Sequence, residues 1–191
     1  VERVDVFTAL KVSGGPFEEK IGTEFINGVP EEYAEELKKG ITEGNVTYEE
    51  LKSGDKVILD RALLHWYPDI KVGDKLKLNI HDGDNTFQKE IEVAAIGDYG
   101  KGLTNYNCLI MAKEGAEKLT INNSSSYFQV IADKDYDEDL EASLQAIVDG
   151  SGRLQMRTWK NEYDTWENAI QMTRGACYAF IIILAAISIM N

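Results

Sequence analysis

The acidic stretch DKDYDED, Asp133 to Asp139, is the densest group of side chains that could bind a cation. Calcium prefers several oxygen ligands, and EF-hand loops place carboxylates at alternate positions. The spacing then departs from that loop, because Glu138 stands where the sharp turn needs glycine and Leu144 stands where a bidentate acid is needed. We therefore expect a solvated turn that caps the following helix, and we predict no metal site.

Nucleophilic, zinc and nucleotide chemistry have little support in the sequence. We expect neither of the two histidines, His65 and His81, to lie near a credible cysteine or serine partner. The two cysteines, Cys108 and Cys177, lie in apolar runs outside any CxxC motif, and we do not expect them to form a disulfide. A glycine-rich phosphate loop is also missing. We predict that this chain is not an enzyme and holds no cofactor.

The charge balance excludes one class of partner. The chain has 191 residues, with 20 basic against 33 acidic side chains and a net charge of −13. Binding to a phosphate backbone needs clustered lysine and arginine, so nucleic acid is not an expected partner. The opening VERVDVFTAL alternates apolar and polar residues and does not resemble a signal peptide.

Alternation and turn residues predict the secondary structure of the first half. Val4 to Val12 reads as a strand with Val4, Val6, Thr8, Leu10 and Val12 on one face, and a second strand is expected around residues 21–26. Residues 28–40 read as a helix, since acids stand at its start, lysines at its end and Gly40 just past it.

Short strands and polar turns follow. Gly-Asp turns open strands in LKSGDKVIL and IKVGDKLKL, residues 61–68 suit a short helix, and HDGDN predicts a hairpin turn. Residues 108–111 read as a buried strand and 113–119 as a short helix.

A β-α-β pattern follows, with strands at 127–132 and 153–158 around a helix whose stripe is Leu140, Leu144, Ile147 and Val148. It mirrors the opening pattern, so we expect the two ends to share a sheet. The predicted fold class is α+β with two lobes: one discontinuous lobe from residues 1–41 and 124–158, and one inserted β-rich lobe from residues 42–123.

Residues 176–190 form a run of fifteen uncharged residues in an otherwise acidic chain. As a helix the run would rise about 22 Å, whereas a bilayer core of about 30 Å needs roughly twenty apolar residues. We expect a membrane span that is cut short at the end of the chain. A buried helix of a water-soluble domain is the alternative. Arg174 and Tyr178 stand where a membrane interface would be expected.

A helical stripe leads into this run. Its residues recur at spacings of four and three, and they are Trp159, Tyr163, Trp166, Ile170, Thr173 and Cys177. No proline interrupts residues 155–190. We predict that residues 159–191 form a stalk helix that continues into the membrane. A helix packed on its own domain explains the first turns equally well.

Four stretches together resemble a known family. They are INGVPEEYAEELKKGITEGN, LKSGDKVILDRALLHWYPDIKVGDKLKL, FQKEIEVAAIGDYG and CLIMAKEGAEKL. In this order and spacing they resemble the extracytoplasmic domain of MacB- and FtsX-like ABC transporter permeases, over most of residues 26–120. The stretch LHWYPD, residues 64–69, departs from the family pattern.

The resemblance implies a two-lobed domain between the first and second membrane helices of a four-span permease. It implies an ABC ATPase as the partner that binds ATP, a second permease protomer, and contact with membrane lipid. In that family, ATP-driven helix movement is transmitted mechanically to the outer domain, and cargoes include peptides, antibiotics and lipoproteins. Residues 1 to about 174 would then be extracytoplasmic, with Trp159, Tyr163, Trp166 and Ile170 packing the stalk.

Two other classes stay open at this point. One is a ligand-sensing ectodomain of a membrane receptor, such as a histidine kinase, which also lies between two membrane-spanning helices. A secreted enzyme is the third class, although no catalytic constellation is recognisable.

Overall fold

The structure, a computed structural model, describes residues 3–17, 24–82, 84–99, 108–120, 126–131 and 138–152, together with 154–156, 158, 167 and 170–174. The chain divides into two compact units, Val1–Asp133 and Lys134–Asn191. The first unit is called the body below. The lobe boundaries predicted from the sequence, at residues 41/42 and 123/124, stay a prediction. Strands from the predicted discontinuous lobe and strands from the predicted inserted lobe join one sheet in the body.

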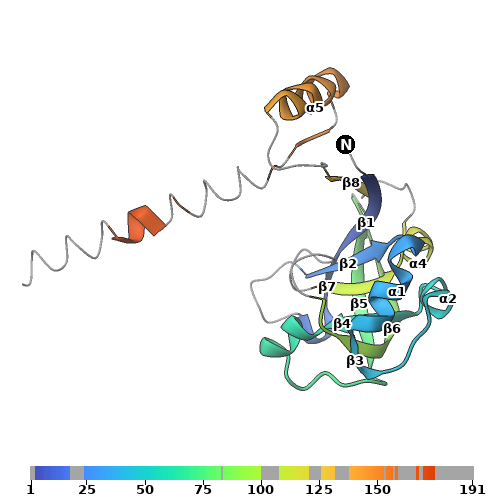
Figure 1. Cartoon of the computed structure of the whole chain (residues 1–191). Coiled ribbons are helices and arrows are strands. Elements are labelled where there is room, and N and C mark those ends of the chain that lie inside the picture. Colours follow the sequence, from blue (N-terminus) through green and yellow to red (C-terminus); the bar gives the residue numbers. More distant parts are fainter. Residues whose placement is uncertain are drawn as a thin grey trace, which may run out of the picture. The chain divides into compact units, whose positions relative to one another are not determined.

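The body is a mixed structure in which strands dominate (Figure 1). Its strands are β1 Arg3–Ser13, β2 Glu24–Val29, β3 Ile41–Gly44, β4 Lys56–Asp60, β5 Lys75–Asp82, β6 Asn85–Gly97, β7 Cys108–Ala112 and β8 Ser126–Ile131. Its helices are α1 Ala34–Gly40, α2 Tyr48–Leu51 and α4 Lys113–Glu117, with 3-10 turns η1 Gly15–Phe17, η2 Glu31–Tyr33 and η3 Arg61–His65.

Six of the strands close into a barrel. β1 pairs with β2, β2 with β7, β7 with β4, β4 with β6, β6 with β5, and β5 returns to β1. The β2–β7 and β4–β6 pairs are parallel and the others antiparallel. Closure gives these strands a partner on both sides, which removes the exposed edges that would invite aggregation.

Alternation along the strands separates two cores. One set of side chains fills the barrel interior, as expected for a small barrel. These residues are Leu10, Val12, Ile26, Val57, Leu59, Leu76, Leu78, Ile80, Ile91, Val93, Ile96, Leu109 and Met111. The alternate residues of β4 and β7, such as Ile58 and Ile110, point to the outside of the barrel, where η2, α1 and α2 bury them with Tyr33, Leu37 and Leu51.

The sequence explains why these two helices form where they do. α1 has Glu35 and Glu36 in its first turn and Lys38 and Lys39 in its last turn, which complements the helix dipole. α2 begins with a capping box, in which the Thr47 hydroxyl accepts from the Glu50 amide and the Glu50 carboxylate accepts from the Thr47 amide. Tyr33 and Leu37 turn toward the barrel and are buried.

Several other expectations are confirmed. β5 and β6 form the predicted hairpin, in which Asp82 pairs with Asn85 across a two-residue turn. Gly54 and Gly73, in the two Gly-Asp phrases, have φ of 81° and 92°, a backbone conformation that favours glycine. The two ends of the body do share a sheet, because β1 pairs with β8.

The predicted strand is found, but the burial of its predicted face changes along β1. Leu10 and Val12 are buried in the barrel, whereas Val4 on the same face is 52% exposed. On the opposite face Asp5 and Phe7 are buried beside Tyr33. The reason is that β1 is longer than the barrel: only its second half contributes to the barrel wall.

The second unit contains α5, Glu138–Ser151, which confirms the helix predicted there. None of its residues is buried, and Ile147 of the predicted stripe is 63% exposed. A strand predicted at 153–158 is not found among the described residues 154–156 and 158, which have no regular secondary structure.

Candidate functional site

The residues predicted to form the stalk fall mostly outside the described part of the chain. Trp159, Tyr163, Trp166 and Tyr178 are not described, and neither is the uncharged run 176–190. Ile170 and Arg174 lie in a described helical stretch, residues 170–174, in which Ile170 is 49% and Met172 77% exposed. The roles of these side chains in stalk packing and at the membrane interface stay predictions.

The search for a membrane span covers the same described residues. Among them, no helix is both long enough and apolar enough to cross a bilayer.

The first half of β1 forms a two-stranded ribbon with β8. Residues 3–8 of β1 pair with β8 in antiparallel register, from Arg3 opposite Ile131 to Thr8 opposite Ser126. The start of β1, at Arg3, and the end of β8, at Ile131, therefore lie side by side at one end of this ribbon (Figure 1). We call residues 3–8 and 126–131 the β1–β8 ribbon.

The two faces of the ribbon differ. Directly opposed residues of an antiparallel pair share a face, which places Val4 with Val130 and Val6 with Phe128. This face is apolar and partly open, since Phe128 is 57% exposed.

The other face of the ribbon is tied to η2. The Tyr33 hydroxyl donates a 2.5 Å hydrogen bond to Asp5 Oδ2, and both side chains are buried. The Phe7 and Tyr33 rings lie 5.6 Å apart between centroids. A buried carboxyl group needs such a donor to offset the loss of water. Tyr33 therefore fixes the ribbon to the outer helical layer of the barrel.

A serine–histidine pair lies at the far end of β1. The Ser13 hydroxyl and His81 Nε2 are 2.8 Å apart, and His81 Nδ1 and the Thr86 hydroxyl are 2.9 Å apart. The expectation that His81 has no serine partner is therefore wrong: strand pairing joins residues 68 apart in the sequence. A neutral hydroxyl stands where a nucleophilic triad needs a carboxylate. The arrangement links the end of β1 to the β5–β6 hairpin.

Tyr48 joins three elements on the outside of the barrel. Its hydroxyl is 2.8 Å from the Val29 carbonyl of β2 and 3.1 Å from Glu114 Oε2 of α4. Burial, and then the hydrogen bond and charge of Glu114, raise the pKa of Tyr48 above its ordinary value. Tyr48 is a neutral donor at physiological pH, which suits a structural tie.

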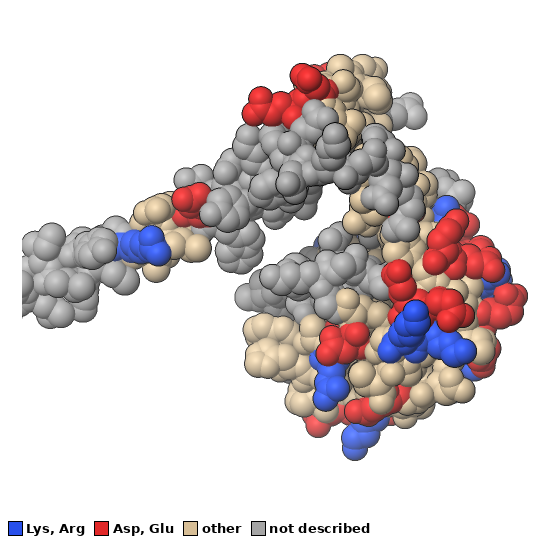
Figure 2. All heavy atoms as spheres, in the orientation of Figure 1, with Lys and Arg blue, Asp and Glu red and all other residues tan. Residues whose placement is uncertain are grey.

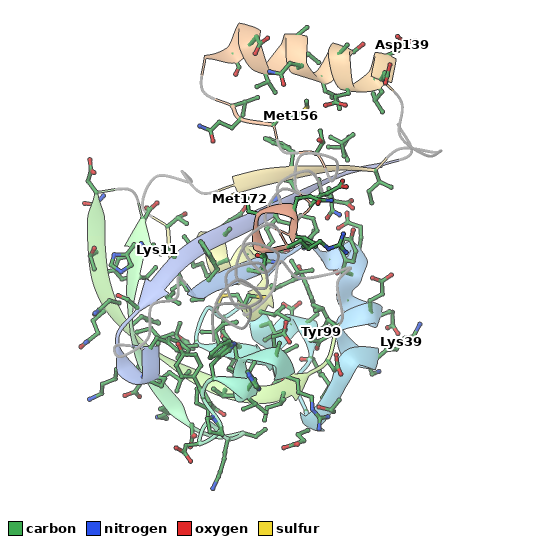
Figure 3. The ribbon with its side chains drawn as sticks, turned by 90° about the vertical axis from the view of Figure 1, so that its left-hand side faces the viewer. Lys11, Lys39, Tyr99, Asp139, Met156 and Met172 are labelled. Carbon is green, nitrogen blue, oxygen red and sulfur yellow. The ribbon has the colours of Figure 1, made fainter. Side chains whose placement is uncertain are left out.

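Tyr99 closes the end of α1. Its hydroxyl donates to the Leu37 carbonyl at 2.8 Å, and a Cβ added at Gly40 or Gly97 would meet its ring. In Figure 3 the ring lies beside α1, whereas Lys39 points away from the body. Burial, followed by the nearby charge of Asp60, raises the pKa of Tyr99. The two glycines in KKG and AIG thus make room for an aromatic side chain.

Metal ligands are not clustered in the described part of the chain. Residues 133–137 of the acidic stretch lie outside the described residues, and Glu138 and Asp139 begin α5. The turn predicted to cap that helix is therefore not described.

A hollow opens between α1 and α2, with a volume of about 210 Å³. Side chains from α1, α2, β4 and the loop that precedes α2 line it. The sequence reasoning did not find this feature, because it depends on how the two helices are spaced over the barrel.

No protein-family model and no curated protein matches the chain. Among solved structures, the chain is similar to the periplasmic region of MacB from Actinobacillus actinomycetemcomitans. The two are 15% identical, with a TM-score of 0.42, over 88% of this chain and 74% of that chain.

Proposed function

We propose that the chain is the extracytoplasmic domain of an ABC transporter permease of the MacB and FtsX type, which transmits ATP-driven movement of membrane helices to the outside. One observation carries the proposal: the start of β1 at Arg3 and the end of β8 at Ile131 lie side by side, so that connections to neighbouring segments would leave the body together. A domain inserted between two membrane segments needs adjacent entry and exit. The sequence adds the uncharged run 176–190 and the family resemblance described above.

The β1–β8 ribbon gives this proposal a mechanical route. Displacement of either connection acts first on the ribbon, whose β1 strand continues into the barrel wall between β2 and β5. Since Leu10 and Val12 are buried in a filled interior, the barrel responds as one body. Trp159, Tyr163, Trp166 and Ile170 pack the stalk against another membrane helix in this proposal, and Arg174 and Tyr178 lie at the interface.

In this proposal, ATP binding and hydrolysis take place on partner proteins. ATP binds to an ABC ATPase subunit or domain, a second permease protomer completes the membrane assembly, and lipid surrounds residues 176–190. The chain itself is proposed to be neither an enzyme nor a cofactor carrier. Its cargo would be of the kinds that the family exports, namely a peptide, an antibiotic or a lipoprotein.

Cysteine labelling in intact cells tests the location of the body. Gln88, exposed on β6, is replaced by cysteine in a chain that also carries Cys177→Ser. A membrane-impermeant maleimide should label this variant from outside. The same chain without Gln88→Cys is the control, since its remaining Cys108 is 1% exposed. Labelling that requires opened cells would contradict an extracytoplasmic body.

A second experiment tests the stalk. The double variant Trp166→Asp and Ile170→Asp in the full-length protein should still support ATP hydrolysis by its partner but lose export, because two charges disrupt an apolar packing stripe. Glu167→Gln, on the opposite side of the predicted helix, is the matched control. Unchanged export in the double variant would refute the stalk role.

A further inference from the structure

The hollow between α1 and α2 has an apolar floor. Leu37, Val46, Leu51 and Ile58 form part of its lining, and each of these side chains is at most 5% exposed. They belong to four segments that the barrel holds in place: α1, the loop before α2, α2 itself and β4. The floor is therefore built into the core of the body.

The rim of the hollow is polar. Glu35, Lys38, Asn45 and Thr47 also line it, and all four are exposed. Thr47 is held by its hydrogen bonds with Glu50, in the capping box of α2. Glu35 forms no salt bridge with another described residue, whereas the Glu50 carboxylate lies 2.9 Å from the Lys56 ammonium.

Negative charge surrounds the hollow. Residues 31–52 contain seven glutamates and three lysines. Figure 2 shows acidic side chains on the side of the body where α1, α2 and α4 lie, with a smaller group of basic side chains beside them. Of the three lysines, Lys52 is already engaged with Glu31 and Glu49. The surface beside the hollow thus favours a cationic partner.

We propose that this hollow is a docking site for a basic segment of a partner protein, in which one aromatic or branched apolar side chain enters the hollow and flanking lysines or arginines face Glu35 and the other acids of α1. A volume of about 210 Å³ accommodates one such side chain. Peptide recognition of this kind combines an apolar anchor with charged neighbours that set orientation. The proposal does not depend on the proposed transport function.

Peptide binding to the full chain tests the site. The probe is a fluorescein-labelled heptapeptide, Gly-Lys-Lys-Phe-Lys-Lys-Gly, and its binding is followed by fluorescence anisotropy at low salt. Two further peptides distinguish the contribution of the apolar side chain to binding from that of the positive charges. One has glycine in place of phenylalanine, and the other has glutamate in place of every lysine. We expect at least about tenfold weaker binding for each.

Variants of the chain locate the binding. Ala34→Phe and, separately, Ala34→Leu fill the hollow from its lining without changing charge, and each should weaken binding of the phenylalanine peptide about tenfold. Glu35→Lys should weaken it more than Glu36→Lys, a matched control on the same helix whose side chain does not line the hollow. Circular dichroism verifies the fold of each variant.

Three results would overturn the proposal. They are equal affinity for the phenylalanine and glycine peptides, which indicates charge attraction alone; unchanged binding by both Ala34 variants when their fold is intact; and no binding of the phenylalanine peptide at millimolar concentration. The labelling and export experiments read out different properties, so failure here is distinct from failure of the transport proposal.

Discussion

The two halves of β1 belong to structures of different character. Residues 8–13 are part of the barrel wall, where β2 and β5 pair with the strand and side chains such as Leu10 are fully buried. Residues 3–7 pair with β8, and their apolar face is half open, as Val4 illustrates. One strand therefore joins a well-packed barrel to a thin ribbon. We therefore expect the ribbon, which leads to the rest of the chain, to be the least stable part of the body.

The largest expected effect comes from truncating the same side chain in the two halves. Val12→Ala should lower the free energy of unfolding by about 2 kcal/mol, because Val12 fills the barrel interior. Val4→Ala, a matched control in the same strand, should change it by no more than about 0.5 kcal/mol. Urea unfolding of both variants checks the difference, and equal losses would remove the distinction between barrel and ribbon.

The tie between ribbon and helical layer gives the next effect. Tyr33→Phe removes the hydroxyl that donates to buried Asp5 and should cost about 1–2 kcal/mol in unfolding free energy. Tyr67→Phe is the matched control, because it removes the hydroxyl of a tyrosine in the barrel core, away from the ribbon. Hydrogen exchange should show that Tyr33→Phe loosens residues 3–7 more than Tyr67→Phe does. The same exchange pattern in both variants would mean that Tyr33 does not secure the ribbon.

The serine–histidine pair is expected to matter for stability alone. Ser13→Ala should lower the unfolding free energy by about 1 kcal/mol or less, the usual net value of one hydrogen bond. Neither the parent chain nor the variant should hydrolyse p-nitrophenyl acetate faster than free imidazole. Ester hydrolysis that disappears with Ser13→Ala would instead identify a nucleophile.

The smallest effect is a pH dependence at α2. Hydrogen bonds from Thr47 and Lys56 lower the pKa of Glu50 to about 2, from an ordinary value of 4.5. A carboxyl whose pKa is depressed by folding stabilises the fold above pH 4.5, and this contribution is lost as the pH falls toward about 2. Unfolding free energies of the parent and of Glu50→Gln should therefore converge between pH 4.5 and pH 2. A constant difference across that range would mean that Glu50 is not held in this way.

Local patterns were enough to predict most strands and helices, because alternation, helix-end charges and turn glycines act over a few residues. Pairing of the two chain ends also followed from their similar patterns, and β1–β8 confirms it. Barrel closure did not follow, since alternation identifies a buried face but not the partner strand, and the parallel β2–β7 and β4–β6 pairs join distant segments.

Sites that depend on long-range placement were missed for the same reason. Ser13 reaches His81 only because β1 lies beside β5. The hollow beside Leu37 exists because α1 and α2 are spaced apart over β4. The exposure of Val4 depends on where the barrel ends along β1, which no local signal marks.

The claim on which this account depends is that a rigid barrel is held through a less stable ribbon. Native-state hydrogen exchange of the full chain tests it directly, by comparing β1 amides that bond to β8 with those that bond to β2 and β5. The account predicts that the ribbon amides exchange at least about tenfold faster, through local opening, while the barrel amides exchange only on global unfolding. Equal protection along the whole of β1 would contradict it.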